Sequence, residues 1–351
     1  MLTFFQAIVI GIIQGVSELF PVSSLGHSVL LPGLFGWHNL VRDQSQGESF
    51  YLAFIVGLHV ATALALLAFF WRDWVRIIGG FFTTLRTRRI ETADQRMAWL
   101  LIVATIPVGI TGLLFEHEFR TLFAKPEAAA IFLTINGFIL FGAELLRRRS
   151  SDRAGTISGR GSSRNAGSRS AQLAGSRSAQ LAESRSSLAE ATSSLAAEPR
   201  SAHAAAATTS PWATATSLTS TEATRDVSTL PFYEAILIGS TQILALFAGI
   251  SRSGVTMAAG LVRGLNHEDA VRFSFLLATP VILAAGVLKI PDLFGPLGNG
   301  IRGQILAGSA AAAVAAYVSV RFLVRWFTTR TLWPFAAYCL AMGTAMIIYF
   351  A

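Results

Sequence analysis

The sequence predicts an all-α polytopic membrane protein, an inverted-topology repeat of about six transmembrane helices and two re-entrant helix pairs. Three observations favour this fold class. The 351-residue chain is 52% hydrophobic and only 14% charged, whereas an ordinary soluble domain carries roughly 25% charged residues. Several apolar runs reach the length that a helix needs to cross a bilayer, about 20 residues. These runs also follow one another in the same order in the two halves of the chain.

The first membrane half, residues 1–149, begins with a broken apolar run over residues 1–35. Pro21 and Gly26 interrupt this run, which predicts that the chain turns back inside the membrane. Non-helical backbone is tolerated at that depth only where protein or water covers it. The next three runs are uninterrupted and are expected to cross the membrane, at approximately residues 50–70, 97–114 and 128–146.

The segment between the halves, residues 150–230, differs sharply in composition. It is rich in Ser, Ala, Thr and Arg, and the octapeptide GSRSAQLA occurs in tandem at 167–174 and 175–182. Such a composition cannot bury enough apolar surface to offset the entropy of ordering, so we predict a disordered cytoplasmic linker. Its arginines leave a contact with anionic lipid headgroups open.

The second membrane half, residues 231–351, repeats the pattern of the first. A broken run is followed by three uninterrupted ones, over approximately 231–262, 273–289, 304–326 and 332–350. A shift of 228 residues (242 minus 14) pairs identical residues of the two broken runs: Gln14 with Gln242, Ser23 with Ser251, and Gly26 with Gly254. We interpret the halves as products of one duplicated segment.

The loops predict the orientation of the chain. Basic residues crowd the connections at 72–96, 147–149 and 321–330, whereas 116–127 and 291–300 are balanced or weakly charged. The positive-inside rule therefore places the basic connections in the cytoplasm. The first broken run then enters the membrane from outside and the second from inside, which is the arrangement of an inverted repeat.

Charge and cysteine content exclude several other classes. The net charge is +8, but the arginines lie in loops between apolar runs, so we expect no nucleic-acid partner. Cys339 is the single cysteine, which excludes an intrachain disulfide and a cysteine-based metal cluster. The N-terminal MLTFFQ lacks a basic stretch, and no cleaved signal peptide is expected.

The first broken run contains QGVSELFPVSSLGH (14–27), an unusually polar stretch for a membrane segment. An ionisable residue inside a membrane is a functional candidate by default. Gln14 and Glu18 lie one helical turn apart and offer oxygen ligands to a hard divalent cation such as Mg²⁺ or Ca²⁺. Ser23 or Ser24 is a candidate nucleophile, and His27 a candidate general acid or base.

The second broken run contains GISRSGVT (249–256), which has the composition of an anion site. A guanidinium binds two phosphate oxygens at once, while hydroxyls and backbone N–H groups at a helix N-terminus bind others. The candidate ligands of the substrate phosphate are Gly249, Ser251, Arg252, Ser253 and Thr256, together with Ser23 of the first stretch.

Taken together, the two stretches predict hydrolysis of a phosphate ester or diphosphate at a membrane. A transporter is an equally good reading of these residues alone, because broken helices in an inverted repeat are transporter architecture. His59, in the run over 50–70, is interpreted as a packed or interhelical histidine.

At these residues the sequence resembles the undecaprenyl-diphosphate phosphatase family, also called the bacitracin-resistance protein family. The family's first motif is Glu or Gln, three residues, Glu, and then PVSS-x-GH, which Gln14, Glu18 and PVSSLGH (21–27) match. Its second motif, PG-x-SRS-x-x-T, matches AGISRSGVT (248–256) except that Ala248 replaces the proline. The resemblance covers about 1–149 and 231–351.

This resemblance implies release of phosphate from undecaprenyl diphosphate, with regeneration of the lipid carrier for cell-wall synthesis and dependence on a divalent metal. By position, Gln14 and Glu18 take the metal-associated places, Ser24 and His27 the catalytic ones, and Arg252 the diphosphate contact. We favour Ser24 over His27 as nucleophile. The family also implies a bacterial inner-membrane protein whose pocket opens to the extracytoplasmic face, and a homodimer is left open.

Two positions depart from the family pattern. Ala248 is expected to loosen the turn before Ser251, and Ile55 stands where many relatives carry an acid. A type-2 phosphatidic-acid phosphatase is excluded, because neither Lys125 nor Lys289 begins that family's first motif. A polyprenyl-phosphate flippase remains the alternative function.

Overall fold

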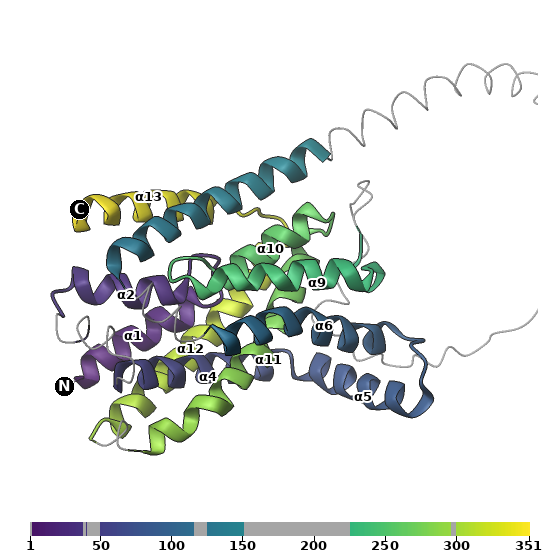
Figure 1. Ribbon diagram of the computed structural model, residues 1–351, viewed down its shortest axis with the longest axis horizontal. Coiled ribbons are helices and arrows are strands. Elements are labelled where there is room, and N and C mark those ends of the chain that lie inside the picture. The colour runs from purple at the N-terminus through teal and green to yellow at the C-terminus, as the bar shows by residue number, and fades with distance from the viewer. Residues whose placement is uncertain (1, 38–39, 41–49, 116–124, 151–224, 296–299) are drawn as a thin grey trace, which may run out of the picture. The chain divides into compact units, whose positions relative to one another are not determined.

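The computed structural model describes residues 2–37, 40, 50–115, 125–150, 225–295 and 300–351. This part of the chain is almost entirely helical (Figure 1), and its β-structure is limited to one isolated bridge between Arg225 and Leu265. The expectation of an all-α polytopic membrane protein is confirmed.

The first half contains the helices that its apolar runs predict and one more. They are α1 (Phe4–Ser17), α2 (Ser24–Leu34), α4 (Phe50–Phe69), α5 (Trp71–Thr87), α6 (Ala93–Leu114) and the helix Pro126–Ser150. The second half contains η1 (Val227–Thr229), α9 (Phe232–Ser240), η2 (Thr241–Leu246), α10 (Arg252–Val262), α11 (His267–Phe294), α12 (Arg302–Trp326) and α13 (Trp333–Phe350).

Helix length separates the crossings from the broken runs. Five described helices are long and apolar enough to span a membrane, or up to six when α4 is counted with the helix bent away from it. The 14 residues of α1 and the 11 of α2 measure about 21 and 17 Å at 1.5 Å per residue, short of the roughly 30 Å hydrocarbon core. The second broken run has the same form, with α10 limited to 11 residues.

Serine side chains start the second helix of each broken run. Ser23 Oγ accepts a hydrogen bond from the Gly26 N–H at 3.1 Å, and Ser251 Oγ accepts one from the Gly254 N–H at 3.1 Å. Both are N-caps, which satisfy N–H groups that a helix leaves free at its start. The pairs are related by the 228-residue shift, so the sequence alignment of the halves corresponds to one local structure.

The two halves interlock. Helix α1 packs along α12, and α9 packs along α6 (Figure 1), so each broken run lies against a crossing of the other half. Glycines make both approaches close: a Cβ on Gly11 would lie 2.9 Å from the Gly308 carbonyl carbon, and one on Gly239 would lie 2.6 Å from Ala104 Cα. Gly11 and Gly239 are also 228 residues apart. The inverted relation of the halves stays a prediction, since it depends on orientation in the membrane.

Two elements differ from the sequence-based expectation. The connection after the run over 50–70 contains the helix α5, whose axis turns 84° from α4. Residues 225–230, which composition assigns to the linker, pack against α6 of the first half and α11 of the second, with Val227 and Leu230 buried. The rest of the predicted linker lies almost wholly outside the described residues.

Candidate active site

The tips of the two broken runs meet. A Cβ on Gly26 would lie 2.9 Å from Gly249 Cα, and one on Gly249 would lie 2.7 Å from the Leu133 nitrogen. Gly249 has φ +111°, a conformation that residues with a Cβ rarely adopt. Ser23, itself at φ +69°, accepts a second hydrogen bond at Oγ, from the Gly249 N–H at 3.2 Å. Ser23 and Gly249 therefore join the two turns.

Asn136, on the helix Pro126–Ser150, links the same turns a second time. Its Nδ2 donates to the Pro21 carbonyl at 3.0 Å, and its Oδ1 accepts from the Ser251 N–H at 3.0 Å. The side chain also lies 3.3 Å from Cys339 Sγ and is fully buried. Sequence reasoning missed this residue, although a lone amide inside an apolar run is a detectable signal.

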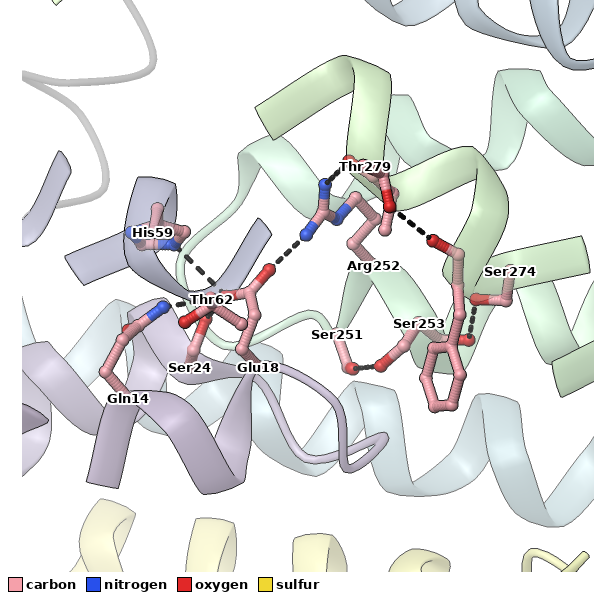
Figure 2. A network of polar contacts seen from close by, with 12 residues as sticks. Gln14, Glu18, Ser24, His59, Thr62, Ser251, Arg252, Ser253, Ser274 and Thr279 are labelled. Carbon is pink, nitrogen blue, oxygen red and sulfur yellow. Dashed lines mark hydrogen bonds and ion pairs between the residues drawn. The ribbon is translucent and has the colours of Figure 1, made fainter. Parts of the chain in front are cut away.

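Glu18, which follows α1 directly, is the centre of the polar network in Figure 2. One carboxylate oxygen accepts from Arg252 Nη2, and the other accepts from Ser24 Oγ. The second oxygen also accepts from Gln14 Nε2 at 2.9 Å and lies 3.2 Å from His59 Nε2. The structure thus brings together Gln14, Glu18 and Ser24 of the first motif with Arg252 of the second.

Ser24 and Arg252 occupy equivalent places in the two halves. Ser24 is the first residue of α2, and Arg252, 228 residues later, is the first residue of α10. Helix N-termini favour negative charge, since their free N–H groups and the helix dipole point towards it. A guanidinium and a hydroxyl at two such ends on either side of Glu18 form a site suited to an anion.

The remaining hydroxyls of the second motif are buried and bonded within the protein. Ser251 Oγ lies 3.1 Å from Ser253 Oγ, and Thr256 Oγ1 lies 2.5 Å from Ser274 Oγ. Ser253 Oγ also donates to the Phe20 carbonyl at 3.4 Å. These side chains shape the turn and the start of α10. Their predicted contact with substrate is untested, and in this structure it would require them to exchange partners.

The two histidines lie in different surroundings. His27 bonds to the Ser23 carbonyl through Nδ1 and to the Tyr338 hydroxyl through Nε2, both at 2.7 Å. Its described contacts do not include Glu18 or Arg252. His59, interpreted from sequence as a packing residue, instead contacts Glu18, and its Nδ1 donates to the Ile55 carbonyl at 2.8 Å. This contact depends on the packing of α4 against the first broken run, which the sequence does not show.

The hydrogen bonds of each histidine favour a different protonation state. A carbonyl and a carboxylate only accept, so both nitrogens of His59 face acceptors, which suits a protonated ring. The partners of His27 are a carbonyl and a hydroxyl, which together satisfy a neutral ring. His59 therefore has the better arrangement for holding a proton beside Glu18.

Access to the network is greatest at its basic groups. The side chains of His59 and Arg252 are 25% and 16% exposed, whereas that of Glu18 is 5% exposed. Arg252 is held by the Ala278 carbonyl, 3.2 Å from Nη1. Its bonds to Ala278 and Glu18 use two of the five N–H groups of a guanidinium. An incoming anion would meet the remaining N–H groups and His59 before it reached Ser24.

The side-chain oxygen of Gln14 is a candidate metal ligand. Its Oε1 is buried and has no hydrogen-bond partner among the described residues. Among those residues no group of three or more His, Cys, Asp or Glu side chains could enclose a cation. The Gln14 amide directs its nitrogen, not this oxygen, at Glu18, so the two side chains could share a cation only if the amide turned over. A turned amide and one carboxylate would suit Mg²⁺, which commonly binds one or two carboxylates and takes other ligands from substrate phosphate and water.

Comparisons with known proteins identify the family of the chain. Residues 7–175 and 187–345 match the family model described as bacitracin resistance protein BacA. The chain is 56% identical over 355 residues to undecaprenyl-diphosphatase 2 of Frankia alni, and the match covers 100% of this chain and 98% of the relative.

More distant relatives match over the same extent. The undecaprenyl-diphosphatase of Mycolicibacterium paratuberculosis is 50% identical over 353 residues, which cover 100% of this chain and 98% of that protein. Undecaprenyl-diphosphatase 2 of Chromobacterium violaceum is 35% identical, with 98% of both chains covered. Because the matches include both broken runs and all the crossings, the chain belongs to the bacitracin resistance protein BacA family.

Proposed function

We propose that the chain is an integral-membrane phosphatase that hydrolyses undecaprenyl diphosphate to undecaprenyl phosphate and inorganic phosphate. The product would be the lipid carrier for peptidoglycan synthesis. The observation that carries the proposal is the contact of Glu18 with both Ser24 and Arg252, because a nucleophile, a proton acceptor and a phosphate ligand could then act on one phosphate. The names of the relatives, undecaprenyl-diphosphatase, agree with it.

Arg252 would bind the terminal phosphate first. Its free N–H groups present a fork that fits two phosphate oxygens, and the N-termini of α2 and α10 favour the same charge. Glu18 then shares Arg252 with the substrate, which weakens the ion pair and leaves the carboxylate more basic towards the Ser24 hydroxyl. In phosphoryl transfer most of the catalysis comes from such positioning and charge stabilisation.

Ser24 would attack the terminal phosphorus. The Ser24 Oγ–P bond forms, the bond from phosphorus to the bridging oxygen breaks, and that electron pair leaves with undecaprenyl phosphate. Glu18 takes the Ser24 proton, since its carboxylate already accepts that hydrogen bond. His59 gives its proton to the leaving oxygen, as a general acid within reach of the same carboxylate.

Water would complete the turnover. The neutral His59 accepts a proton from a water molecule that attacks the phosphorylated Ser24, and Glu18 returns its proton to Ser24 Oγ as inorganic phosphate leaves. Both groups end in their starting states. His27, which holds the Ser23 carbonyl at the start of α2, orients Ser24 in this scheme, whereas the motif alone gives it an acid–base role.

A divalent cation, Mg²⁺ or Ca²⁺, would be held by Glu18 and, once the amide turns over, by Gln14 Oε1. When bound, it would neutralise charge on the diphosphate oxygens. We also propose that the site opens to the extracytoplasmic side of the bacterial inner membrane. That placement rests on the basic connections at 72–96, 147–149 and 321–330, which the positive-inside rule assigns to the cytoplasm.

The test is phosphate release from a long-chain polyprenyl diphosphate by purified protein, first with magnesium or calcium and then with chelator. Glu18→Gln and Arg252→Ala are expected to reduce release about a hundredfold or more, which is about 2.7 kcal/mol in the barrier. Glu144→Gln is a matched control, because Glu144 is another buried carboxylate that pairs with a histidine, His267, at 2.6 Å.

The alternative is a polyprenyl-phosphate flippase that uses the same anion site. Folded wild-type protein that releases no phosphate in detergent, where there is no gradient, would favour the flippase. Translocation of a labelled lipid in vesicles would then be the next measurement.

A further inference from the structure

The helix α5 carries an exposed apolar stripe that the proposed reaction does not use. Its members are exposed by 48 to 63% and recur every three or four residues: Trp71, Val75, Ile78, Phe82 and Leu85. At 100° per residue they fall within an arc of about 80°. The stripe therefore runs straight along one face of the helix.

The opposite face of α5 is fixed against the protein. Asp73, Ile77 and Thr84 are buried there, and a Cβ on Gly80 would lie 2.9 Å from the Gln95 nitrogen of α6. Asp73 also accepts from Arg272 of α11 at 3.0 Å. Because this face is held by α6 and α11, the helix cannot rotate to bury the stripe.

A row of arginines lies beside the stripe. On a helical wheel Arg72, Arg76 and Arg86 fall between about 60° and 140° from Trp71, between the stripe and the buried face. Arg88 and Arg89 follow the helix, so the segment 71–90 carries five arginines against one aspartate, a net charge of +4 (5 minus 1). The Arg72 guanidinium lies 5.4 Å from the Trp71 ring centroid.

We propose that α5 lies at the cytoplasmic surface of the membrane and binds an anionic phospholipid there. The stripe would enter the acyl-chain boundary while the arginines hold the headgroup phosphate. Three features support this occupant: the 84° bend between α4 and α5, the complementary charge of the segment, and the pairing of Trp71 with Arg72. Aromatic and basic side chains of this kind anchor helices at the headgroup level.

The apolar stripe and the arginine row lie side by side on α5, and this arrangement favours a lipid over a protein partner. A partner helix would cover the apolar stripe and leave the arginines unused. A phospholipid would use both, because its acyl chains contact the stripe while its anionic headgroup contacts the arginines beside it. Polybasic segments beside a crossing bind anionic headgroups, and each basic residue near the surface strengthens that binding. The proposal is independent of the reaction at Glu18.

The experiment titrates full-length protein in detergent with brominated phosphatidylglycerol and follows quenching of tryptophan fluorescence. Brominated phosphatidylcholine is the zwitterionic reference. Arg72→Gln combined with Arg86→Gln is expected to raise the apparent Kd for phosphatidylglycerol about tenfold or more, and to leave the phosphatidylcholine titration unchanged. Trp71→Phe is expected to remove part of the quenching.

Controls separate the lipid from its alternatives. Arg321→Gln with Arg325→Gln changes two exposed arginines of α12 and is expected to keep the wild-type Kd. Millimolar inorganic phosphate is expected not to displace the lipid, because phosphate alone cannot use the stripe. Equal Kd values in wild type and the Arg72/Arg86 variant would overturn the proposal. So would a dimer that Phe82→Ser dissociates, since the stripe would then be an interface between copies.

Discussion

Replacing Asn136 by alanine tests whether the junction of the two turns controls the reaction. The substitution removes the 3.0 Å bonds that Asn136 makes to the Pro21 carbonyl and the Ser251 N–H. The N–H loses its partner, and the carbonyl keeps only the weaker bond from Cys339 Sγ at 3.7 Å. Both groups are buried inside a membrane segment, where water does not replace a lost bond. The unsatisfied N–H alone costs about 1–3 kcal/mol, so the junction loses at least that much.

Part of that loss is expected to appear in turnover. Ser251 caps α10 and Pro21 lies between Glu18 and Ser24, so both sides of the site are free to shift. Because a displacement of about 1 Å can cost a hundredfold in rate, we expect kcat for phosphate release to fall about 10- to 100-fold with a smaller change in KM. Thr134→Ala is the control, since that hydroxyl bonds only within its own helix, to Ala130 at 3.0 Å.

A double-mutant cycle decides whether Asn136 acts through Arg252. If it positions the guanidinium, Asn136→Ala should add little to the loss already caused by Arg252→Ala, because coupled sites are not additive. Full additivity, or kcat within about threefold of wild type for Asn136→Ala, would refute the reasoning.

Further predictions concern the other parts of the site and the linker. Arg252→Lys should lower kcat/KM at least about tenfold, because an ammonium cannot replace a guanidinium that contacts both Glu18 and Ala278. An unchanged kcat/KM would contradict bidentate binding of the phosphate by Arg252. His59→Ala should slow phosphate release about a hundredfold, as measured beside Glu18→Gln, and near-normal release would remove His59 from the mechanism. Deleting most of the linker, residues 151–219, should spare activity, and loss of hydrolysis in a well-folded deletion protein would show that the linker takes part.

The sequence predicted the arrangement of helices well, because membrane crossings follow from the length of apolar runs. Pro21 marked the first turn correctly, whereas Gly26 lies within the first turn of α2 and not in the bend itself. The 228-residue shift that pairs Gln14 with Gln242 also pairs close backbone contacts, which the sequence pattern could not show. The helix α5 was missed for a physical reason. Its arginines led us to assign the segment to a cytoplasmic connection, and its apolar residues are too few to span a membrane. Their spacing of three and four residues is nevertheless that of a helix.

Only the site residues that lie within the two short motifs could be predicted from the sequence. Glu18 and Arg252 were identified because an ionisable residue in a membrane needs an explanation. The contact of His59 with Glu18 and the link through Asn136 depend on how α4 and the helix Pro126–Ser150 pack against the turns, which lies beyond any short motif. The same packing buries Ser251, which the motif alone counted as a phosphate ligand.

The equivalence of Ser24 and Arg252 has an evolutionary consequence. If one ancestral segment inserted in both orientations and paired with itself, its two tips met across a two-fold axis, and each carried the same residue. Such a dimer could offer two hydroxyls or two guanidinium groups to a phosphate, never one of each. Joining the copies into a single chain would have freed the two positions to diverge, so that one became the attacking group and the other the anchor for the phosphate.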